Sequence, residues 1–347
     1  MNYKNKKIII SIIIPVFNSK KTIKKCLNSI FNQKINHLLF EVIIINDNSK
    51  DNSLSIIENF KKKFDNISII NNSKNIGPGF SRNKGLRVAK GNYIQFLDSD
   101  DHLYDNSLKV LISYISKFKF DILCYNFIHS YSKKIKKGNR KDFKYITNNK
   151  KKLIKNFFSG ELDGSVIFTL IKKSIIDNNK ITFPKYLHED IPYIFEVYLC
   201  SKKIKIISEI IYFKKNRKNS ILNTLNRKRI SGLLTAWKKL LKVKTFEKII
   251  NKQKIKKEFL KFHARGYNGC VESLIILNLK LVTDIRLRII NFKYLFKFIL
   301  NDNEIIKLNK SSKKDLITNH FIYFFKNGSI NQSKVLKFEE SIKKFKN

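Results

Sequence analysis

The chain has 347 residues, of which 43% are hydrophobic, including 28 Phe and 14 Tyr. This composition excludes a disordered polycation, because so many apolar side chains can fill a core. Lys and Arg number 71 against 27 Asp and Glu, a formal net charge of +44. With 11 Gly and 4 Pro, an all-β fold rich in tight turns is not expected. The length allows one large domain with an appendage, or two domains.

The basic and apolar start of the chain, MNYKNKKIIISIIIPVFN, is interpreted as a first core strand rather than a signal peptide. Its apolar run is short, ends at Pro15 and Asn18, and lacks a cleavage site of small residues. No segment has the length of a membrane-spanning helix. The four Cys residues are scattered without a C-x-x-C pair, which fits a reducing compartment. We therefore expect a cytoplasmic protein, or one that is peripheral on the inner face of the cell membrane.

The charge of +44 raises the question of a polyanionic partner. Lys, Asn and Ile crowd the whole chain, which indicates a compositional bias spread over every surface. No nucleic-acid motif is visible, so an anionic membrane surface or an anionic substrate is favoured over DNA or RNA. A basic nucleic-acid-binding protein is retained as an alternative.

The first half of the chain alternates apolar runs typical of strands with amphipathic helices, which predicts a mainly parallel sheet with crossover helices. The predicted strands are Ile8–Val16, Glu41–Asn46, Ile67–Ile70, Tyr93–Leu97, Asp121–Phe127 and Ile204–Phe213. The predicted helices are Lys20–Gln33, a segment carrying Leu54, Ile57 and Phe60, Phe80–Ala89, a segment carrying Leu108, Leu111, Ile112 and Ile115, and one that begins near Asp190. Between them, the basic stretch Ser130–Lys152 is predicted to be a surface excursion or mobile loop.

The fourth predicted strand stops at three carboxylates, Asp98, Asp100 and Asp101, in a chain where acidic residues are scarce. Asp98 and Asp100 are two residues apart, so from an extended segment both can offer oxygen ligands to one divalent cation. The alternative is an acidic turn that caps the following helix, which suffices for Asp101 or Asp105. For Asp98 and Asp100 a binding site is favoured, because open α/β sheets bind ligands where buried strands end.

Four segments together resemble the family 2 glycosyltransferases, which are inverting enzymes of GT-A fold that use nucleotide-activated sugars. The segments are SIIIPVFN at Ser11–Asn18, IINDNSKDNS at Ile44–Ser53, GFSRNKGLRVAKGNYIQFLDSDD at Gly79–Asp101 and HED at His188–Asp190. The resemblance covers roughly Ile8 to Ile221. It implies that residues 1–221 form a GT-A catalytic domain with a mainly parallel central sheet, followed at 222–347 by a basic helical C-terminal region.

The resemblance also implies which residues bind the nucleotide. Pro15, Phe17 and Asn18 would line its pocket, and Asp47 would accept a hydrogen bond from a uracil ring. Arg82 would face the nucleotide, whereas a solvated basic face is the simpler interpretation of Arg82, Arg87 and Lys90. Where the family has a glycine after the strand-end aspartate, this chain has Asn48, which can adopt a positive φ.

Further roles follow from the same resemblance. Asp98 and Ser99 would lie near the ribose or sugar, and Asp100 would hold Mn²⁺ or Mg²⁺. Asp190 would be the catalytic base, with Glu189 orienting it or binding acceptor; helix capping is the alternative for this pair. In the segment NRKNSI, the residues implied to close over the diphosphate are Arg217 and Ser220.

The resemblance implies a metal-dependent hexosyl- or N-acetylhexosaminyl-type transferase that moves a sugar from a nucleotide-sugar donor, and the expected donor is a UDP-sugar. The predicted acceptor is a hydroxyl of a saccharide or lipid-linked molecule in cell-surface polysaccharide or glycolipid synthesis. A nucleotidyltransferase on a similar sheet is disfavoured, because no glycine-rich basic loop follows the first strand. The apolar stripes of the C-terminal helices are expected to pack against the catalytic domain or a second subunit, or to lie in a membrane interface.

Overall fold

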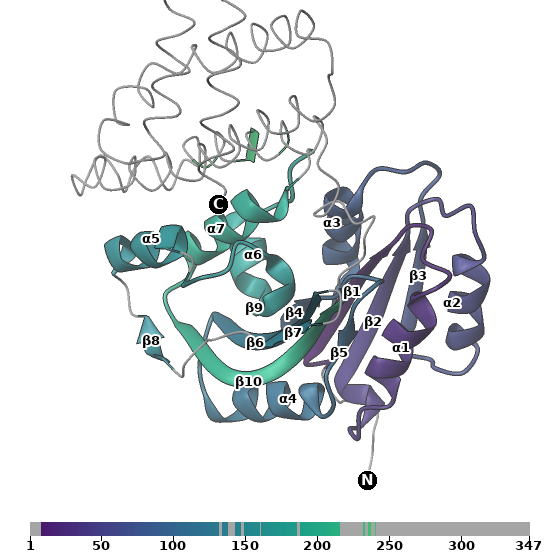
Figure 1. The fold of residues 1–347 in the computed structure, drawn as a ribbon, viewed down its shortest axis with the longest axis horizontal. Coiled ribbons are helices and arrows are strands. Elements are labelled where there is room, and N and C mark those ends of the chain that lie inside the picture. Colours follow the sequence, from purple (N-terminus) through teal and green to yellow (C-terminus); the bar gives the residue numbers. More distant parts are fainter. Residues whose placement is uncertain are drawn as a thin grey trace, which may run out of the picture.

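The computed structural model describes residues 8–131, 134–137, 143–146, 149–159, 161–185 and 188–215, together with residues 232, 235, 236 and 240. Within these ranges the chain forms a ten-stranded mixed sheet with helices on both faces (Figure 1). The strand order is β3-β2-β1-β4-β9-β6-β10-β5, with β7 beside β6 and β8 beside β10. The C-terminal region predicted at 222–347 lies outside the described residues except at those four positions, so the domain boundary near residue 221 stays a prediction.

The first part of the sheet is parallel, as predicted. Its strands are β1 (Ile10–Val16), β2 (Phe40–Asn46), β3 (Ile67–Asn71) and β4 (Tyr93–Phe96). Strand β1 lies between β2 and β4, and β2 pairs with β3. Every residue of β1 and β2 is buried, since Ile and Val cover both faces of a strand that has helices on either side.

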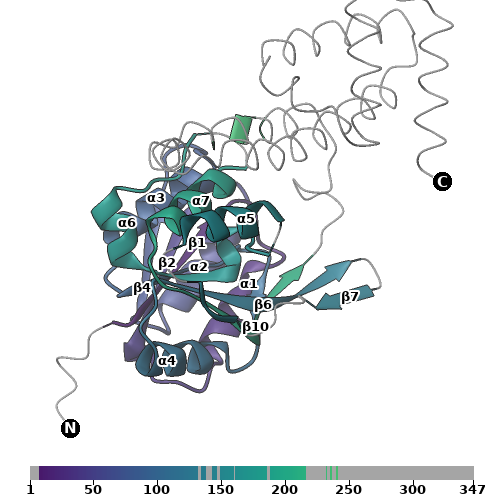
Figure 2. The same cartoon turned by 90° about the vertical axis from the view of Figure 1, so that its left-hand side faces the viewer.

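Helices cover the two faces of this sheet as two separate layers. Helices α1 (Ile23–Phe31), α2 (Ser53–Lys61) and α4 (Ser107–Lys117) lie on one face. On the other face lie α3 (Pro78–Val88), α5 (Lys150–Ser159), α6 (Lys173–Asn179) and α7 (Asp190–Cys200), as Figure 2 also shows. The predicted helices match α1 to α4 and α7, whereas α5 and α6 were not predicted. None of the described helices is both long and apolar enough to cross a membrane.

The second part of the sheet mixes strand directions. Strand β9 (Thr169–Lys172) runs antiparallel between β4 and β6 (Ile122–Tyr131). Strand β10 (Ile204–Lys215) runs parallel to β6 and antiparallel to the short β5 (His102–Leu103). Its carboxyl end therefore returns to the end of β4, where the acidic residues lie.

The stretch Ser130–Lys152 was predicted to be a surface excursion or mobile loop, and in its described part it contains two strands and the start of a helix instead of a loop. Strand β7 (Lys134–Lys137) forms a hairpin with β6, β8 (Phe143–Ile146) pairs with β10, and α5 begins at Lys150. Lysine-rich sequences are typical of edge strands, where charge discourages pairing with another chain, so their composition resembles that of a loop. Pairing with β6 and β10 decides the conformation here.

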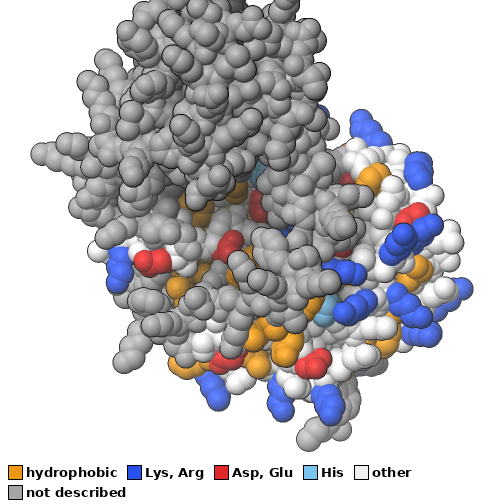
Figure 3. Space-filling view, viewed as in Figure 1, with side chains coloured by type: hydrophobic (Ala, Val, Ile, Leu, Met, Phe, Trp, Pro, Cys, Tyr) orange, Lys and Arg blue, Asp and Glu red, His pale blue; other side chains and the backbone are white. Residues whose placement is uncertain are grey.

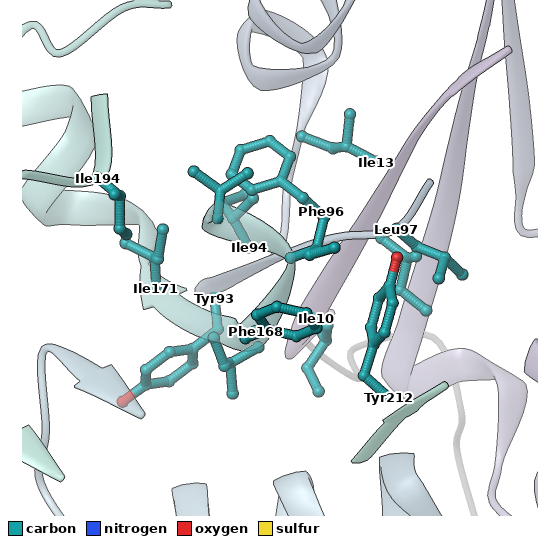
Figure 4. Close-up of a cluster of buried hydrophobic side chains, with 14 of the residues drawn as sticks. Ile10, Ile13, Tyr93, Ile94, Phe96, Leu97, Phe168, Ile171, Ile194 and Tyr212 are labelled. Atoms are coloured by element: carbon teal, nitrogen blue, oxygen red, sulfur yellow. The ribbon is translucent and has the colours of Figure 1, made fainter. Parts of the chain in front are cut away.

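The apolar core surrounds β4 and supports the strand end that carries the acidic residues (Figure 4). Side chains from β1, β4, β9, α7 and β10, from the 3-10 helix before β9 and from the residue after β4 meet there, all of them buried: Ile10, Ile13, Tyr93, Ile94, Phe96, Leu97, Phe168, Ile171, Ile194 and Tyr212. Close packing of this kind makes β4 a rigid support for the residues that follow it.

Candidate functional site

Polar side chains follow the apolar runs at the carboxyl ends of all four neighbouring parallel strands. Asn18 follows β1, Asp47 follows β2, Asn72 follows β3 and Asp98 follows β4. These ends lie at one edge of the sheet, which is the edge where open α/β sheets bind ligands. Asn72 was missed in the sequence, although its place after an apolar strand run is the same signal that identified Asp98.

Asp47 fixes the loop that leads into α3. Asp47 is only 3% exposed. One carboxylate oxygen accepts hydrogen bonds from Asn72 Nδ2 at 2.8 Å and from the Ile76 amide at 2.9 Å, and the other accepts from the Gly77 amide at 2.8 Å. Gly77 has φ +86°, a conformation that favours glycine. The contact of Asp47 with uracil stays a prediction, while its role in shaping this loop is evident.

Phe17 and Asn18 lie where the loops after β1 and β2 meet. Asn18 Oδ1 accepts from the Lys50 amide at 2.8 Å, and its own amide donates to Ser49 Oγ at 3.1 Å. Asn18 and Asn48 have φ +47° and +59°, so the expectation of a positive φ at Asn48 is confirmed. Phe17 is 48% exposed beside them, available for contact with a ligand.

Pro15 lies inside β1, opposite Ile45 of β2. Alternate residues of β1 face β4, since the Ile13 carbonyl accepts from the Leu97 amide. Pairing with β4 extends only to Ile13, so at Pro15 the missing N–H interrupts no ladder hydrogen bond. The predicted roles of Pro15, Phe17 and Asn18 toward a nucleotide stay predictions.

Asp98 to Asp101 form a tight turn rather than the extended segment that was predicted, because the Asp101 amide donates to the Asp98 carbonyl at 3.0 Å. The turn brings a carboxylate oxygen of each of Asp98, Asp100 and Asp101 within 4.8 Å of the others. Ser99 Oγ forms a hydrogen bond of 2.7 Å with Ser19 Oγ, which ties the turn to the start of α1.

The predicted helix-capping role of Asp101 is wrong. Helix α4 follows Asn106, which makes no side-chain cap hydrogen bond. Asp101 is buried and accepts hydrogen bonds from Tyr212 Oη at 2.7 Å and from the Lys215 amide at 2.8 Å. Burial, followed by the charges of Asp100 and Asp98, raises the pKa of Asp101 well above its ordinary value. Asp101 thus joins the end of β10 to the acidic turn.

The acidic turn fits a hard divalent cation. Ligand oxygens bound on opposite sides of Mg²⁺ are about 4.2 Å apart, close to the spread of 4.8 Å among these three carboxylates. Burial raises the pKa of Asp101, and the nearby carboxylates raise it further; a cation would relieve the repulsion among these carboxylates. All three ligands are oxygens, which suits Mg²⁺ or Mn²⁺ rather than Zn²⁺.

Arg82 joins this turn to the start of α7. Its guanidinium forms ion pairs with Asp98 Oδ1 at 2.7 Å and with Glu189 Oε1 at 2.9 Å, and the residue is 6% exposed. Arg87 and Lys90 are exposed, so the interpretation of Arg82 as part of a solvated basic face is wrong. Burial lowers the pKa of Arg82, but the carboxylates of Asp98, Glu189 and Asp190 outweigh burial and raise it, which keeps the guanidinium charged.

Glu189 and Asp190 lie side by side in sequence at the start of α7. Glu189 is 7% exposed, and burial raises its pKa to about 7 although the positive charge of Arg82 opposes that shift. Its side chain makes no cap hydrogen bond, so helix capping does not explain it. Asp190 is the first residue of α7 and is partly exposed. Arg217 and Ser220 lie outside the described residues.

Three comparisons identify similar proteins. Residues 11–179 match the profile of the family described as Glycosyl transferase family 2. The Poly(ribitol-phosphate) beta-glucosyltransferase of Bacillus spizizenii is 34% identical over 218 residues, 59% of this chain and 32% of that protein. The Cholesterol galactosyltransferase of Borreliella burgdorferi is 27% identical over 272 residues, 73% of each protein.

The crystal structure of S. aureus TarS 1–349 in complex with UDP-GlcNAc has a TM-score of 0.66 and 22% identity, covering 87% of this chain and 84% of that one. At this identity the likeness establishes the fold alone. The match covers 32% of the Bacillus relative, so this chain spans about a third of the length of that protein.

Proposed function

Because the chain belongs to glycosyltransferase family 2 through residues 11–179, we propose that it transfers a sugar from a nucleotide-sugar donor to an acceptor hydroxyl, with inversion at the anomeric carbon. The family and the GT-A-type fold expected from the sequence are confirmed. One observation carries the proposal. The loop held by Asp47, the acidic turn and the Glu189–Asp190 pair meet at one edge of the sheet, with Arg82 between the last two.

The proposed donor is a UDP-sugar of the hexosyl or N-acetylhexosaminyl type. Asp47 at the end of β2, with Pro15, Phe17 and Asn18 at the end of β1, would bind the nucleoside. The TarS structure was determined with UDP-GlcNAc, which supports this donor class for a chain of the same fold. Arg217 and Ser220 would contribute to the diphosphate side of the site.

Asp100 would hold Mn²⁺ or Mg²⁺ together with one or both of its neighbours in the acidic turn. A divalent cation at this position supplies stabilisation of the negative charge that develops on the leaving diphosphate. Asp98 and Ser99 would orient the ribose or sugar, because Arg82 and Ser19 fix their side chains. Asp190 would remove the proton from the acceptor hydroxyl as it attacks the opposite face of the anomeric carbon.

The proposed acceptor is a saccharide or a lipid-linked molecule of the cell surface. The names of the two relatives cover both classes, one acting on poly(ribitol-phosphate) and one on cholesterol. A cytoplasmic location, peripheral contact with the anionic inner face of the membrane and a homo-oligomer formed through residues 222–347 belong to the same proposal.

A nucleotide-release assay tests this function. We expect at least one member of a panel of nucleotide sugars to release its nucleotide in the presence of Mn²⁺ and an acceptor mixture, and a chelator to stop the release. Asp190→Asn should lower kcat by about 10²–10⁴-fold, because it removes the general base. Asp100→Asn should abolish the Mn²⁺-dependent release, because it removes the proposed metal ligand. The matched control is Asp177→Asn on α6, which should retain activity, since Asp177 forms an exposed i, i+4 ion pair with Lys173 and is not one of the proposed site residues.

Failure of every donor to show Mn²⁺-dependent release or binding would contradict the proposal. Pyrophosphate release from a nucleoside triphosphate would favour the nucleotidyltransferase alternative. Salt-sensitive binding of nucleic acid that persists in Asp100→Asn, without any turnover, would favour the nucleic-acid-binding alternative.

A further inference from the structure

Arg82 is the buried link between two carboxylates that come from different elements. Asp98 follows β4 and Glu189 precedes α7, yet both bind the same guanidinium, at 2.7 and 2.9 Å. Its remaining nitrogen, Nε, is buried from solvent and has no hydrogen-bond partner among the described residues. Two of the guanidinium nitrogens are therefore bound to carboxylates of the protein, and the residue as a whole is only 6% exposed, which leaves little of it open to a ligand.

Helix α3, which carries Arg82, is fixed against the segment before α7 at further points. Asn83 exchanges two hydrogen bonds with the backbone of Phe183, at 2.8 and 2.9 Å. At Gly79 the helix approaches Glu189 so closely that a Cβ would lie 2.5 Å from Glu189 Cγ. The position of Glu189 is thus set by α3 through an ion pair and a close contact.

The same helix is anchored at its amino end by the loop that Asp47 holds, through the amides of Ile76 and Gly77. One rigid element therefore contacts three parts of the site: the strand end assigned to the nucleotide, the acidic turn and the start of α7. Asp190 follows Glu189 directly and begins the first turn of α7, so a displacement of Glu189 would turn the Asp190 carboxylate.

We propose that Arg82 is a positioning residue, which holds Asp98 and the Glu189–Asp190 pair in register across the boundary between donor and acceptor, rather than a residue that binds the nucleotide. The inference rests on the proposed function. It differs from the role that the sequence resemblance implies for Arg82, and the two assignments predict different kinetics. A positioning role affects the chemical step, because misplacement of a catalytic group by about 1 Å costs on the order of 10²-fold in rate.

The test compares Arg82→Lys with the unsubstituted full chain and with Arg87→Lys, a matched change at an exposed position of the same helix. Lysine keeps the charge but presents a single ammonium in place of a fork that reaches two carboxylates. For Arg82→Lys we expect kcat to fall by about 30- to 100-fold, while KM for the nucleotide sugar and Kd for UDP with Mn²⁺ change by less than about 3-fold. Arg87→Lys should match the unsubstituted chain in all three quantities.

Glu189→Gln supplies the second variant, because it keeps the size of the side chain and removes its charge. It should show the same split, a lower kcat with an unchanged Kd for UDP. The double variant should lose little more than either single one, since both changes break the same link. If Arg82→Lys fails to fold, the values of kcat and Kd for Glu189→Gln still test whether Arg82 is a positioning residue.

A Kd for UDP that weakens in parallel with kcat in Arg82→Lys would overturn the inference and favour a nucleotide contact. A kcat within about 2-fold of the unsubstituted chain in both variants would overturn it as well. Absence of turnover by the unsubstituted chain with every donor is a different result, because it contradicts the proposed function itself.

Discussion

At the scale of single residues, the site concentrates carboxylates in a chain where 71 Lys and Arg outnumber 27 Asp and Glu. Asp98, Glu189 and Asp190 surround one buried arginine, and each of them acts on the pKa of Arg82. A buried arginine and carboxylate compensate each other, so removing either partner alone leaves an uncompensated charge. The excess of carboxylates over arginine is one reason why Glu189 retains a proton more tightly than an exposed glutamate does.

The raised pKa of Glu189 predicts a pH-dependent stability. Burial raises this pKa from 4.5 to about 7, so the folded chain binds a proton that the unfolded chain releases. That contribution to the free energy of unfolding is complete below pH 4.5 and is lost as the pH rises through about 7. Glu189→Gln cannot titrate. The stability of the unsubstituted chain relative to this variant should therefore fall between pH 5 and pH 8, by on the order of 1–3 kcal/mol.

Urea unfolding of the two proteins at a series of pH values measures this difference. Glu58→Gln, an exposed position on α2, is the control and should follow the unsubstituted chain at every pH. Parallel stability curves for the unsubstituted chain and Glu189→Gln would show that Glu189 does not take up a proton in this pH range.

At the scale of elements, the turn before β4 sets the position of the strand that ends in the acidic residues. The Gly91 amide donates to Ser11 Oγ of β1 at 2.8 Å, and Ser11 Oγ donates to Glu41 of β2 at 2.6 Å. The Lys90 amide donates to the same oxygen of Glu41 at 2.6 Å. These hydrogen bonds join β1, β2 and the turn before β4. Ser11, which takes part in two of them, is fully buried.

Gly91→Ala should destabilise the fold. A Cβ at this position would lie 2.5 Å from the Ser11 backbone nitrogen and 2.7 Å from the Ile10 carbonyl carbon. Both atoms belong to the backbone of a central strand and cannot move aside cheaply. We expect a loss of about 1–3 kcal/mol in the free energy of unfolding, measured by urea denaturation.

The control for this change is Gly164→Ala, where the nearest atom would lie 3.7 Å away. It should be neutral or slightly stabilising, because alanine restricts the unfolded chain. Equal stability of Gly91→Ala and Gly164→Ala would mean that β1 and the turn before β4 separate at little cost.

The parallel strands were predictable because a strand that is covered on both faces is mostly apolar, and β1 and β2 each carry a run of Ile and Val. Strand β9 was not, since its four residues TLIK carry no period that separates a strand from a short helix. In the site, Asp98 was found from its place at a strand end, and Asp47 from the resemblance of its segment to the family. The pairing of Arg82 with Glu189 was not, because the two are 107 positions apart in the chain and meet only where α3 contacts the segment before α7.

At the scale of the whole molecule, charge is divided between an acidic site and a basic surface. The chain has a formal net charge of +44. Lys and Arg side chains gather over the region of α1 and α2 in the space-filling view (Figure 3). The exposed lysines on and beside these helices are Lys20, Lys21, Lys24, Lys25, Lys50, Lys61, Lys62 and Lys63. Such a surface attracts polyanions through a long-range field that salt screens.

This charge predicts binding to an anionic membrane surface. Each Lys or Arg near such a surface contributes about 1 kcal/mol, and the attraction decays over a Debye length of about 10 Å at 0.1 M salt. At roughly 50 mM salt, where this attraction is weakly screened, we expect the purified chain to sediment with vesicles that contain phosphatidylglycerol. At roughly 0.5 M salt it should be released, because salt screens the attraction. Vesicles of phosphatidylcholine alone should not retain it. Replacing Lys61, Lys62 and Lys63 by Gln should weaken retention if the face that carries α2 meets the membrane. Retention on neutral vesicles would rule out this electrostatic mode of binding. Failure to bind anionic vesicles at low salt would rule it out as well.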